Sequence, residues 1–192
     1  MDQILLFNKR TKSNFLPENI EKLNDYSKNC DLCSLSKNSI NCEFGQGNIN
    51  GKIFFTSKDS SIYNDINTKA ILDHIVDDIF KFNREDIYFT NLLKCEPRVI
   101  SNDYKNEIDI CIDYFYKQVD IVSPRVIFTF GDTIDYLTST SNNILELSGN
   151  IYNYEGIVII PVVSPLFLLK NPSYKDKIYN DLKKIKKKLE QL

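Results

Sequence analysis

Short apolar runs and helix-spaced apolar residues alternate along this chain of 192 residues. Each short run is bounded by glycine, proline or polar residues, which is the pattern of a buried β-strand. The runs cover residues 51–57, 87–93, 125–131 and 156–163. Strands that read as nearly continuous apolar runs are buried on both faces, so these runs predict a parallel sheet with helices on either side.

Apolar side chains elsewhere recur every three or four residues, as they do on one face of an α-helix. Helices are predicted over residues 18–29, 64–82 and 103–122, and from a Ser173 cap onward. The alternation continues without a repeat or a low-complexity linker. The sequence therefore predicts one α/β domain over residues 1–192, with a three-layer αβα architecture around a central four-stranded parallel sheet.

The polar loops behind three of the predicted strands are the expected location of a functional site. In open parallel sheets, ligands bind at the carboxyl ends of the strands. The loops in question follow Ser57, Asn91 and Val163. Residues in these loops are therefore the first candidates for chemistry.

The charge composition adds one restriction. Lys and Arg total 24, Asp and Glu total 26, and the net charge is −2. A chain with no basic excess has no overall attraction for nucleic acid, so any DNA contact must come from a local patch. No apolar run approaches the ~20 residues that span a bilayer, and the N-terminal residues show no secretion signal. We therefore expect a cytoplasmic monomer without membrane contact.

The five cysteines carry the first candidate chemistry. Cys30 and Cys33 are spaced C-x2-C, a pattern shared by metal sites, redox dithiols and small disulfides. Redox motifs usually follow a strand, whereas Cys30 ends a predicted helix. A structural disulfide is not expected without a secretion signal. A metal ion or cluster is therefore favoured, and it needs two more ligands.

Cys95 and Cys111 are the candidates for these remaining ligands. Cys95 lies just beyond the second predicted strand, and Cys111 follows 16 residues later on the next helix. Four thiolates suit a [4Fe–4S] cluster or a tetrahedral zinc ion. The alternative is that Cys95 and Cys111 are small buried hydrophobic residues, as free cysteines often are. Cys42 is left without a role.

Five segments, in order, resemble the family 4 uracil-DNA glycosylases, the iron–sulfur branch of the uracil-DNA glycosylase superfamily. They are the C-x2-C at 30–33, TNLLKCEP at 90–97, Cys111, PRVIFTFG at 124–131 and SPLFLLKNP at 164–172. The resemblance extends from about Cys30 to Leu182, which is most of the chain.

This resemblance implies a cofactor and a partner. It implies a uracil-DNA glycosylase-like domain whose N-terminal helix and cluster loop occupy about residues 17–42. The DNA that it binds would be single-stranded or uracil-containing. The cofactor would be a [4Fe–4S] cluster, with zinc as the alternative, held by Cys30, Cys33, Cys95 and Cys111.

The residues expected to act on the base are only partly present. In the family, an asparagine at the end of the second strand reads the base, and Asn91 matches it. The family's G-E-A-P-G loop is replaced by SKDSS at 57–61, and its late histidine by Ser164. Serine donates a hydrogen bond but lacks the charge and reach of an imidazole. Asp65, like Asp59, either holds a catalytic water or is a solvated loop carboxylate.

These replacements lead us to expect a DNA-binding protein of the base-excision repair type whose uracil excision is impaired or lost. The catalytic candidates are Asn91, Ser164 and Asp65, and Asn91 is also the base-binding candidate. One alternative is an active glycosylase for uracil or a damaged base, with a rearranged water site. A second alternative is a metal-stabilised scaffold with no role in nucleic-acid binding.

DNA contacts are expected from Lys94 and Arg98, which flank Cys95, and from Lys170 in the last loop. These side chains would bind phosphates and position the protein without reading sequence. The lysine-rich end of the last helix is interpreted as solvated, since lysines there suit the helix dipole. The single histidine, His74, is interpreted as a partly exposed helix residue.

Overall fold

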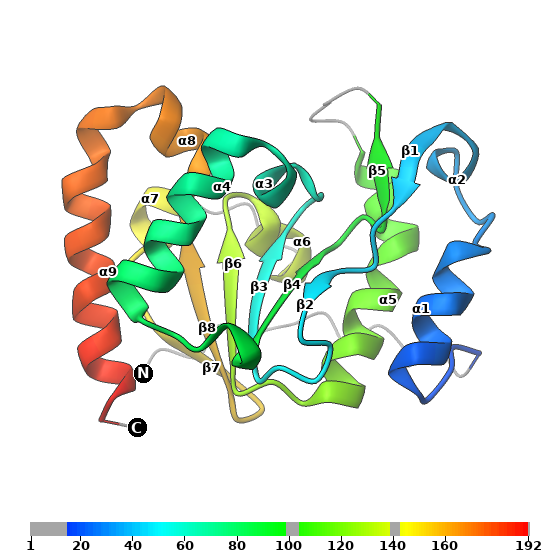
Figure 1. Cartoon of the computed structure of the whole chain (residues 1–192), viewed down its shortest axis with the longest axis horizontal. Helices are drawn as coiled ribbons and strands as arrows, with labels where there is room; N and C mark the ends of the chain where they lie inside the picture. The colour runs from blue at the N-terminus through cyan, green and yellow to red at the C-terminus, as the bar shows by residue number, and fades with distance from the viewer. Residues whose placement is uncertain (1–14, 99–103, 139–142, 192) are drawn as a thin grey trace.

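The computed structural model describes residues 15–98, 104–138 and 143–191. Within these residues, six strands form one mixed sheet (Figure 1). They are β2 (Gln46–Gly47), β3 (Ile53–Ser57), β4 (Ile87–Asn91), β6 (Val126–Phe130), β7 (Tyr152–Tyr154) and β8 (Ile157–Val162). The strand order is β2-β4-β3-β6-β8-β7, in which the four inner strands are parallel and the two edge strands antiparallel.

The predicted four-stranded parallel sheet is confirmed as the centre of this larger sheet. The sequence does not predict the two edge strands, because β2 has two residues and β7 has three. Runs this short show no alternation that could be told from a loop. The antiparallel edges pair backbone groups of β4 and β8 that would otherwise lack partners.

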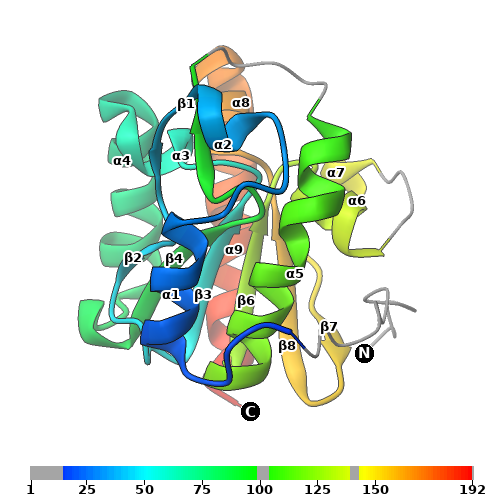
Figure 2. The ribbon, with the colours of Figure 1, turned by 90° about the vertical axis from the view of Figure 1, so that its right-hand side faces the viewer.

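Helices cover both faces of the sheet, which confirms the predicted three-layer αβα architecture (Figure 2). One face carries α4 (Ile66–Asp73), the π-helix η1 (His74–Phe80), α8 (Pro165–Lys170) and α9 (Lys175–Leu189). The other face carries α1 (Ile20–Lys28), α5 (Lys105–Val122) and α6 (Thr133–Thr138).

Two hydrophobic cores follow from the alternation of side chains along each strand. Phe55 stacks on Phe128 beneath α4, with ring centroids 4.6 Å apart. The preceding residue, Phe54, points to the opposite core and packs on Tyr88, with ring centroids 5.4 Å apart. The sheet is therefore buried on both faces, as its continuous apolar strands predict.

The helix predicted over residues 64–82 begins at Ile66 and ends at Phe80. A short helix, α3 (Ser61–Asn64), ends at Asp65, and α4 begins after it. From His74 the helix continues as η1, and it ends at Lys81 in the left-handed conformation, with φ of 56°. The predicted apolar stripe is buried at Ile71, Ile75 and Ile79.

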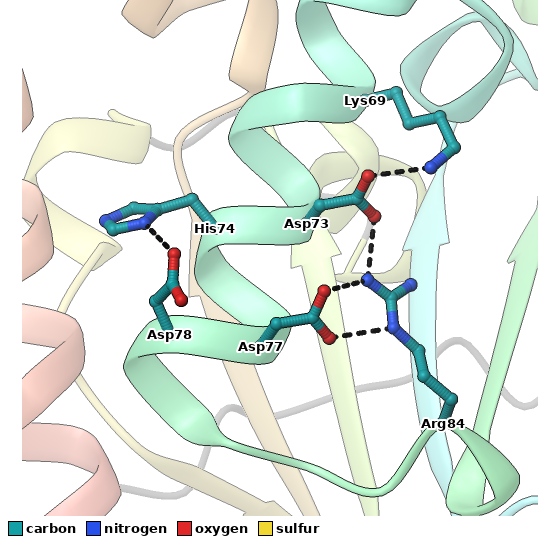
Figure 3. Close-up of polar contacts among 6 residues, drawn as sticks. All are labelled: Lys69, Asp73, His74, Asp77, Asp78 and Arg84. Carbon is teal, nitrogen blue, oxygen red and sulfur yellow. Dashed lines mark hydrogen bonds and ion pairs between the residues drawn. The ribbon is translucent and has the colours of Figure 1, made fainter.

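Ion pairs tie α4 and η1 to the following turn (Figure 3). Arg84 donates to both carboxylate oxygens of Asp77, at 2.8 and 2.5 Å, and to Asp73 Oδ1 at 2.8 Å. His74 Nδ1 lies 2.6 Å from Asp78 Oδ2. With 40% of its side chain exposed, His74 is a partly exposed helix residue, as predicted.

The last helix begins later than predicted. Ser173 lies inside a 3-10 turn, Pro172–Tyr174, and α9 begins at Lys175. A serine within a helical turn lacks the extended backbone that an N-cap residue requires, so the Ser173 cap is wrong. The buried stripe of α9 follows the predicted spacing at Ile178, Leu182 and Ile185.

A second, two-stranded sheet joins the N-terminal segment to the connection between β4 and α5. Its strands are β1 (Ser39–Cys42) and β5 (Cys95–Pro97), which pair antiparallel. These strands, α1 and α2 (Leu35–Asn38) gather on the α5 side of the molecule (Figure 1). In the part of the chain that the structure describes, no helix has the length and apolarity to cross a bilayer.

Candidate functional site

A cavity of about 440 Å³ opens at the carboxyl edge of the sheet. The segments behind β3, β6 and β8 line it, at the edge where ligands bind in open parallel sheets. Its volume is within the range of pockets that hold small organic molecules. Its polar lining includes Ser57, Lys58, Asp59, Asp65, Asp132 and Ser164.

The SKDSS segment at residues 57–61 forms a turn held by its own side chains. Ser57 Oγ donates to the backbone oxygen of Asp59 at 2.6 Å, and Asp59 Oδ1 accepts from the backbone N–H of Ser61 at 2.9 Å. Lys58 Nζ lies 3.1 Å from Asp132 Oδ2, so it pairs with the segment behind β6. These bonds use the Ser57 hydroxyl, Asp59 Oδ1 and the Lys58 ammonium within the protein.

Asp65 lines the cavity and also caps α4. Its Oδ1 accepts from the backbone N–H groups of Asn67 and Thr68, both at 3.0 Å. These bonds, led by the one from Thr68, hold the pKa of the Asp65 carboxyl below its usual value. Asp65 is therefore ionised at neutral pH, and it has a structural role that the sequence analysis did not predict.

Ser164 lines the same cavity at the start of α8. Its Oγ accepts a hydrogen bond from the backbone N–H of Phe167 at 3.1 Å, so this serine is the N-cap of the helix. Gly131, at the end of β6, has a φ of 62°, and a Cβ there would come within 3.3 Å of Ser164 Cβ. The ends of β6 and β8 thus meet closely beside the cavity.

Asn91 ends β4 but is not among the residues that line the cavity. It is buried, with 1% of its surface exposed. Its Nδ2 donates to the backbone oxygens of Glu43, at 3.2 Å, and of Leu93. Its Oδ1 accepts from the hydroxyl of Tyr63. Both amide hydrogens and one acceptor position are therefore used within the protein.

Tyr63 is a site residue that the sequence analysis missed. It is buried and packs beside Phe89, with ring centroids 6.1 Å apart. Burial raises the pKa of the Tyr63 hydroxyl well above its usual value, and the charge of Glu43 acts in the same direction. The hydroxyl therefore stays protonated and donates to Asn91. No motif marks Tyr63, because this contact joins residues 28 positions apart.

Lys94 is buried inside the protein, with 1% of its surface exposed. Its ammonium donates to Asn91 O at 2.6 Å, Gln118 Oε1 at 2.7 Å and Thr90 Oγ1 at 2.9 Å. It also lies 5.3 Å from the centre of the Phe44 ring. Burial lowers the pKa of Lys94 to about 7. The expectation that Lys94 contacts DNA does not fit this position, because its partners are internal and no DNA phosphate can reach the ammonium.

Arg98 and Lys170 are exposed, in contrast to Lys94. Arg98 follows β5, and Lys170 ends α8. Both elements reach the upper edge of the molecule in Figure 1, toward which the parallel strands of the sheet point. The elements that carry or precede these cations, α8 and β5, therefore lie on the side of the molecule toward which the parallel strands point.

The four candidate ligands, Cys30, Cys33, Cys95 and Cys111, line one small cavity between α1, α2, β5 and α5. Cys111 Sγ accepts from the backbone N–H of Lys94 at 3.3 Å. Soft thiolates brought together from separate segments suit an iron–sulfur cluster or zinc. Among the residues that the structure describes, however, no three His, Cys, Asp or Glu side chains converge tightly enough to form a metal site. Their role as ligands remains a prediction.

Cys42, the fifth cysteine, does not line that cavity. The two residues are opposite one another in the pairing of β1 with β5. A hydrogen bond from Cys95 lowers the pKa of the Cys42 thiol to about 6, although burial acts in the opposite direction. Cys42 is therefore a fifth thiol beside the candidate ligand set.

Comparisons with known proteins agree on one family. A family model described as the uracil DNA glycosylase superfamily matches residues 44–183, which include the whole central sheet. A type-4 uracil-DNA glycosylase of Saccharolobus solfataricus is 29% identical over 189 residues, covering 90% of this chain and 87% of the relative. Type-4 uracil-DNA glycosylases of Sulfurisphaera tokodaii and Thermotoga maritima are 24% and 25% identical, covering 88% of this chain in each case and 84% and 89% of the relatives.

Proposed function

Because the chain belongs to the uracil DNA glycosylase superfamily, we propose that it is a DNA-binding repair protein whose uracil excision is impaired or lost. It would bind single-stranded or uracil-containing DNA. The observation that carries this proposal is the position of Asn91, whose amide is buried outside the cavity and bonded within the protein. A base flipped into the cavity would therefore not meet the Asn91 amide, and the asparagine that lines the cavity among the described residues is Asn67.

The lack of groups that would stabilise the departing uracil also supports impaired excision. Uracil departs as an anion while positive charge builds on the sugar. Lys58 is the cation lining the cavity, and Asp132 already pairs with it. Ser164 carries no charge, and its oxygen accepts from the N-terminal turn of α8. Groups that stabilise such charges are each worth about 10²- to 10⁴-fold in rate, so their loss would leave slow excision at best.

An active enzyme with a rearranged water site is the second candidate function. Asp59 and Asp65 both line the cavity, and a carboxylate there can orient a water and stabilise positive charge on the sugar. The same carboxylates would repel a departing uracil anion. We therefore favour impaired excision over this alternative.

We assign the [4Fe–4S] cluster to Cys30, Cys33, Cys95 and Cys111, with zinc as the alternative cofactor. All four line one small cavity, which supports this assignment. When bound, the cluster would supply fixed links between the α1–α2 loop, β5 and α5. Arg98 and Lys170 would contact DNA phosphates and set the position of the strand without reading its sequence.

The decisive experiment measures DNA binding and uracil release by the same anaerobically purified protein. We expect it to bind a uracil-containing single strand at low salt and to release uracil far more slowly than the Saccharolobus solfataricus relative. Rapid uracil release that Asp65→Asn abolishes would establish the rearranged enzyme instead. Asparagine also serves as an N-cap, so this variant separates chemistry from the capping of α4. Absence of DNA binding would favour a metal-stabilised scaffold.

A further inference from the structure

We propose that the cavity at the carboxyl edge accepts a positively charged, N-alkylated purine of DNA and hydrolyses its glycosidic bond. This inference rests on the proposed function, because it places a flipped DNA base in the same cavity. It departs from uracil in the kind of base that the lining recognises. Charge, hydrogen-bonding groups and leaving-group chemistry each support it.

The charge of the lining favours a cation. Asp59, Asp65 and Asp132 contribute three negative charges, and Lys58 contributes one positive charge. Lys58 and Asp132 neutralise one another at 3.1 Å, so the net charge of the cavity comes from Asp59 and Asp65. A cationic base is attracted to such a lining, whereas a base that leaves as an anion is repelled.

The two unpaired carboxylates of the lining offer free acceptors. Ser57 and Thr68 direct their hydroxyl hydrogens to backbone oxygens. Asp59 and Asp65 each use Oδ1 to accept from the backbone, and no described residue donates to their Oδ2 atoms. Uracil presents two carbonyl oxygens and one N–H, whereas 7-methylguanine and 3-methyladenine present an exocyclic amine beside their positive charge. The exocyclic amine of a methylated purine therefore matches the free carboxylate oxygens, while Asn67 and Ser61 offer donors in the same lining.

A methylated purine can leave without the imidazole that Ser164 replaces. When the bond between C1′ and the base nitrogen breaks, its electron pair goes to the base and neutralises the existing positive charge. The base departs as a neutral molecule and needs no acid or cation to support it. Water then adds to C1′ of the sugar cation, and its proton passes to Asp59 or Asp65 and on to solvent. The products are the neutral alkylated purine, an abasic sugar and one proton.

The cavity also has room and apolar surface for a purine. Its volume is about 440 Å³, and Phe130, Pro165 and Leu166 contribute apolar lining. An aromatic base can pack against such a wall while its amine faces the carboxylates. The cavity therefore combines a wall for the ring with acceptors for its edge.

The test uses anaerobically purified full chain and duplex DNA methylated with dimethyl sulfate. Released 7-methylguanine and 3-methyladenine are measured by chromatography, beside a uracil-containing oligonucleotide. We expect methylpurine release at least about 10-fold above the spontaneous rate, with uracil release near background. Asp59→Asn should lower the rate about 10-fold, because asparagine still accepts from Ser61 but carries no charge. The matched control, Asp120→Asn, alters an exposed aspartate of α5 and should leave release unchanged.

The outcomes separate this inference from the proposed function. Methylpurine release at the spontaneous rate, by protein that still binds DNA, would overturn the inference and leave the proposed function intact. Rapid uracil release would overturn the proposed function. Melting temperature with 7-methylguanosine and with guanosine gives a second measurement. We expect stabilisation by the methylated nucleoside alone, which Asp59→Asn removes, and equal stabilisation by both nucleosides would also contradict the inference.

Discussion

Residues at the mouth of the sheet are committed to holding the fold together. Ser164 caps α8, Asp65 caps α4, and Asn91 bridges Tyr63 to the backbone of Glu43. In each case at least one polar atom of the side chain is used within the protein. Support for a departing uracil anion therefore requires a side chain that brings a further donor or a positive charge to the cavity.

Ser164 allows the two roles to be separated. Ser164→Ala should cost about 1 kcal/mol of folding stability through loss of the N-cap, and it should leave uracil release unchanged. Ser164→His should raise uracil release, because an imidazole beside the cavity can support the leaving anion. Adding a glycine-rich 57–61 loop should raise it further and non-additively, since both changes act on one transition state. Denaturant unfolding and a single-turnover uracil assay measure these effects, and equal uracil release by the alanine and histidine variants would contradict the argument.

The cysteines make a second prediction at the residue scale. Cys95→Ser and Cys111→Ser should lose iron and lower the stability of the protein, because binding of a cluster is coupled to folding of the segments that it joins. Cys42→Ser should keep its iron, since Cys42 does not line the cavity shared by the four candidate ligands. Iron content and absorbance near 400 nm of anaerobically purified protein measure the outcome. Equal iron in all three variants would show that the ligand assignment is wrong.

Among the helices, the one predicted over residues 64–82 differs from its prediction at its start and in its last turns. The sequence pattern predicts its buried stripe but not the N-cap at Asp65 or the π-helical turns from His74. Arg84 then joins this helix to the turn before β4 through Asp73 and Asp77. Burial alone would raise the pKa of the Asp73 carboxyl, but hydrogen bonds from Lys69 and Arg84 outweigh it and lower the value.

This pKa shift predicts an acid-sensitive contribution to stability. Since the folded pKa of Asp73 is lowered, the stabilisation is present above the unfolded value, about 3.9, and is lost as pH falls through the folded value. Arg84→Met should lower stability at neutral pH by about 1 kcal/mol or less, and it should flatten the fall in melting temperature in acid. The control Arg125→Met changes an exposed arginine elsewhere and should keep the wild-type acid profile. An unchanged profile in Arg84→Met would show that the ion pairs contribute nothing.

Across the whole molecule, two groups of exposed cations can be compared for DNA contact. Arg98 and Lys170 belong to elements at the carboxyl edge, together with the cavity, whereas the lysine-rich end of α9 lies at the opposite end of the sheet (Figure 1). DNA whose base enters the cavity would therefore pass Arg98 and Lys170. Substitution of each group of cations can therefore test which end of the sheet contacts DNA.

The salt dependence of DNA binding shows which of these cations contact phosphates. The double variant Arg98→Ala/Lys170→Ala should reduce the slope of log K against log salt by about 1.4 for single strands, about 0.7 for each lost phosphate contact. The matched double variant Lys187→Ala/Lys188→Ala removes the same charge from the end of α9 and should leave the slope unchanged. Equal reductions in both double variants would indicate non-specific attraction over the whole surface.

The sequence by itself determined the central parallel sheet and the layers around it. Continuous apolar strands and helix-spaced apolar stripes are local patterns, and burial of Phe54, Phe55 and the α9 stripe follows from them directly. Spacing also singled out the cysteines that line one cavity, although their ligand role stays a prediction. The strands β2 and β7 were not predicted, because segments of two or three residues are too short to show a period.

Only the tertiary structure decided which polar residues face a substrate. Asn91 ends the second predicted strand and Lys94 follows it closely. Both were expected to face DNA, yet both are buried. Their partners, Gln118 and Tyr63, lie 24 and 28 positions away, and no local pattern encodes such contacts. A polar group enters a core only where distant residues supply its hydrogen bonds, so its orientation is settled when the segments pack together.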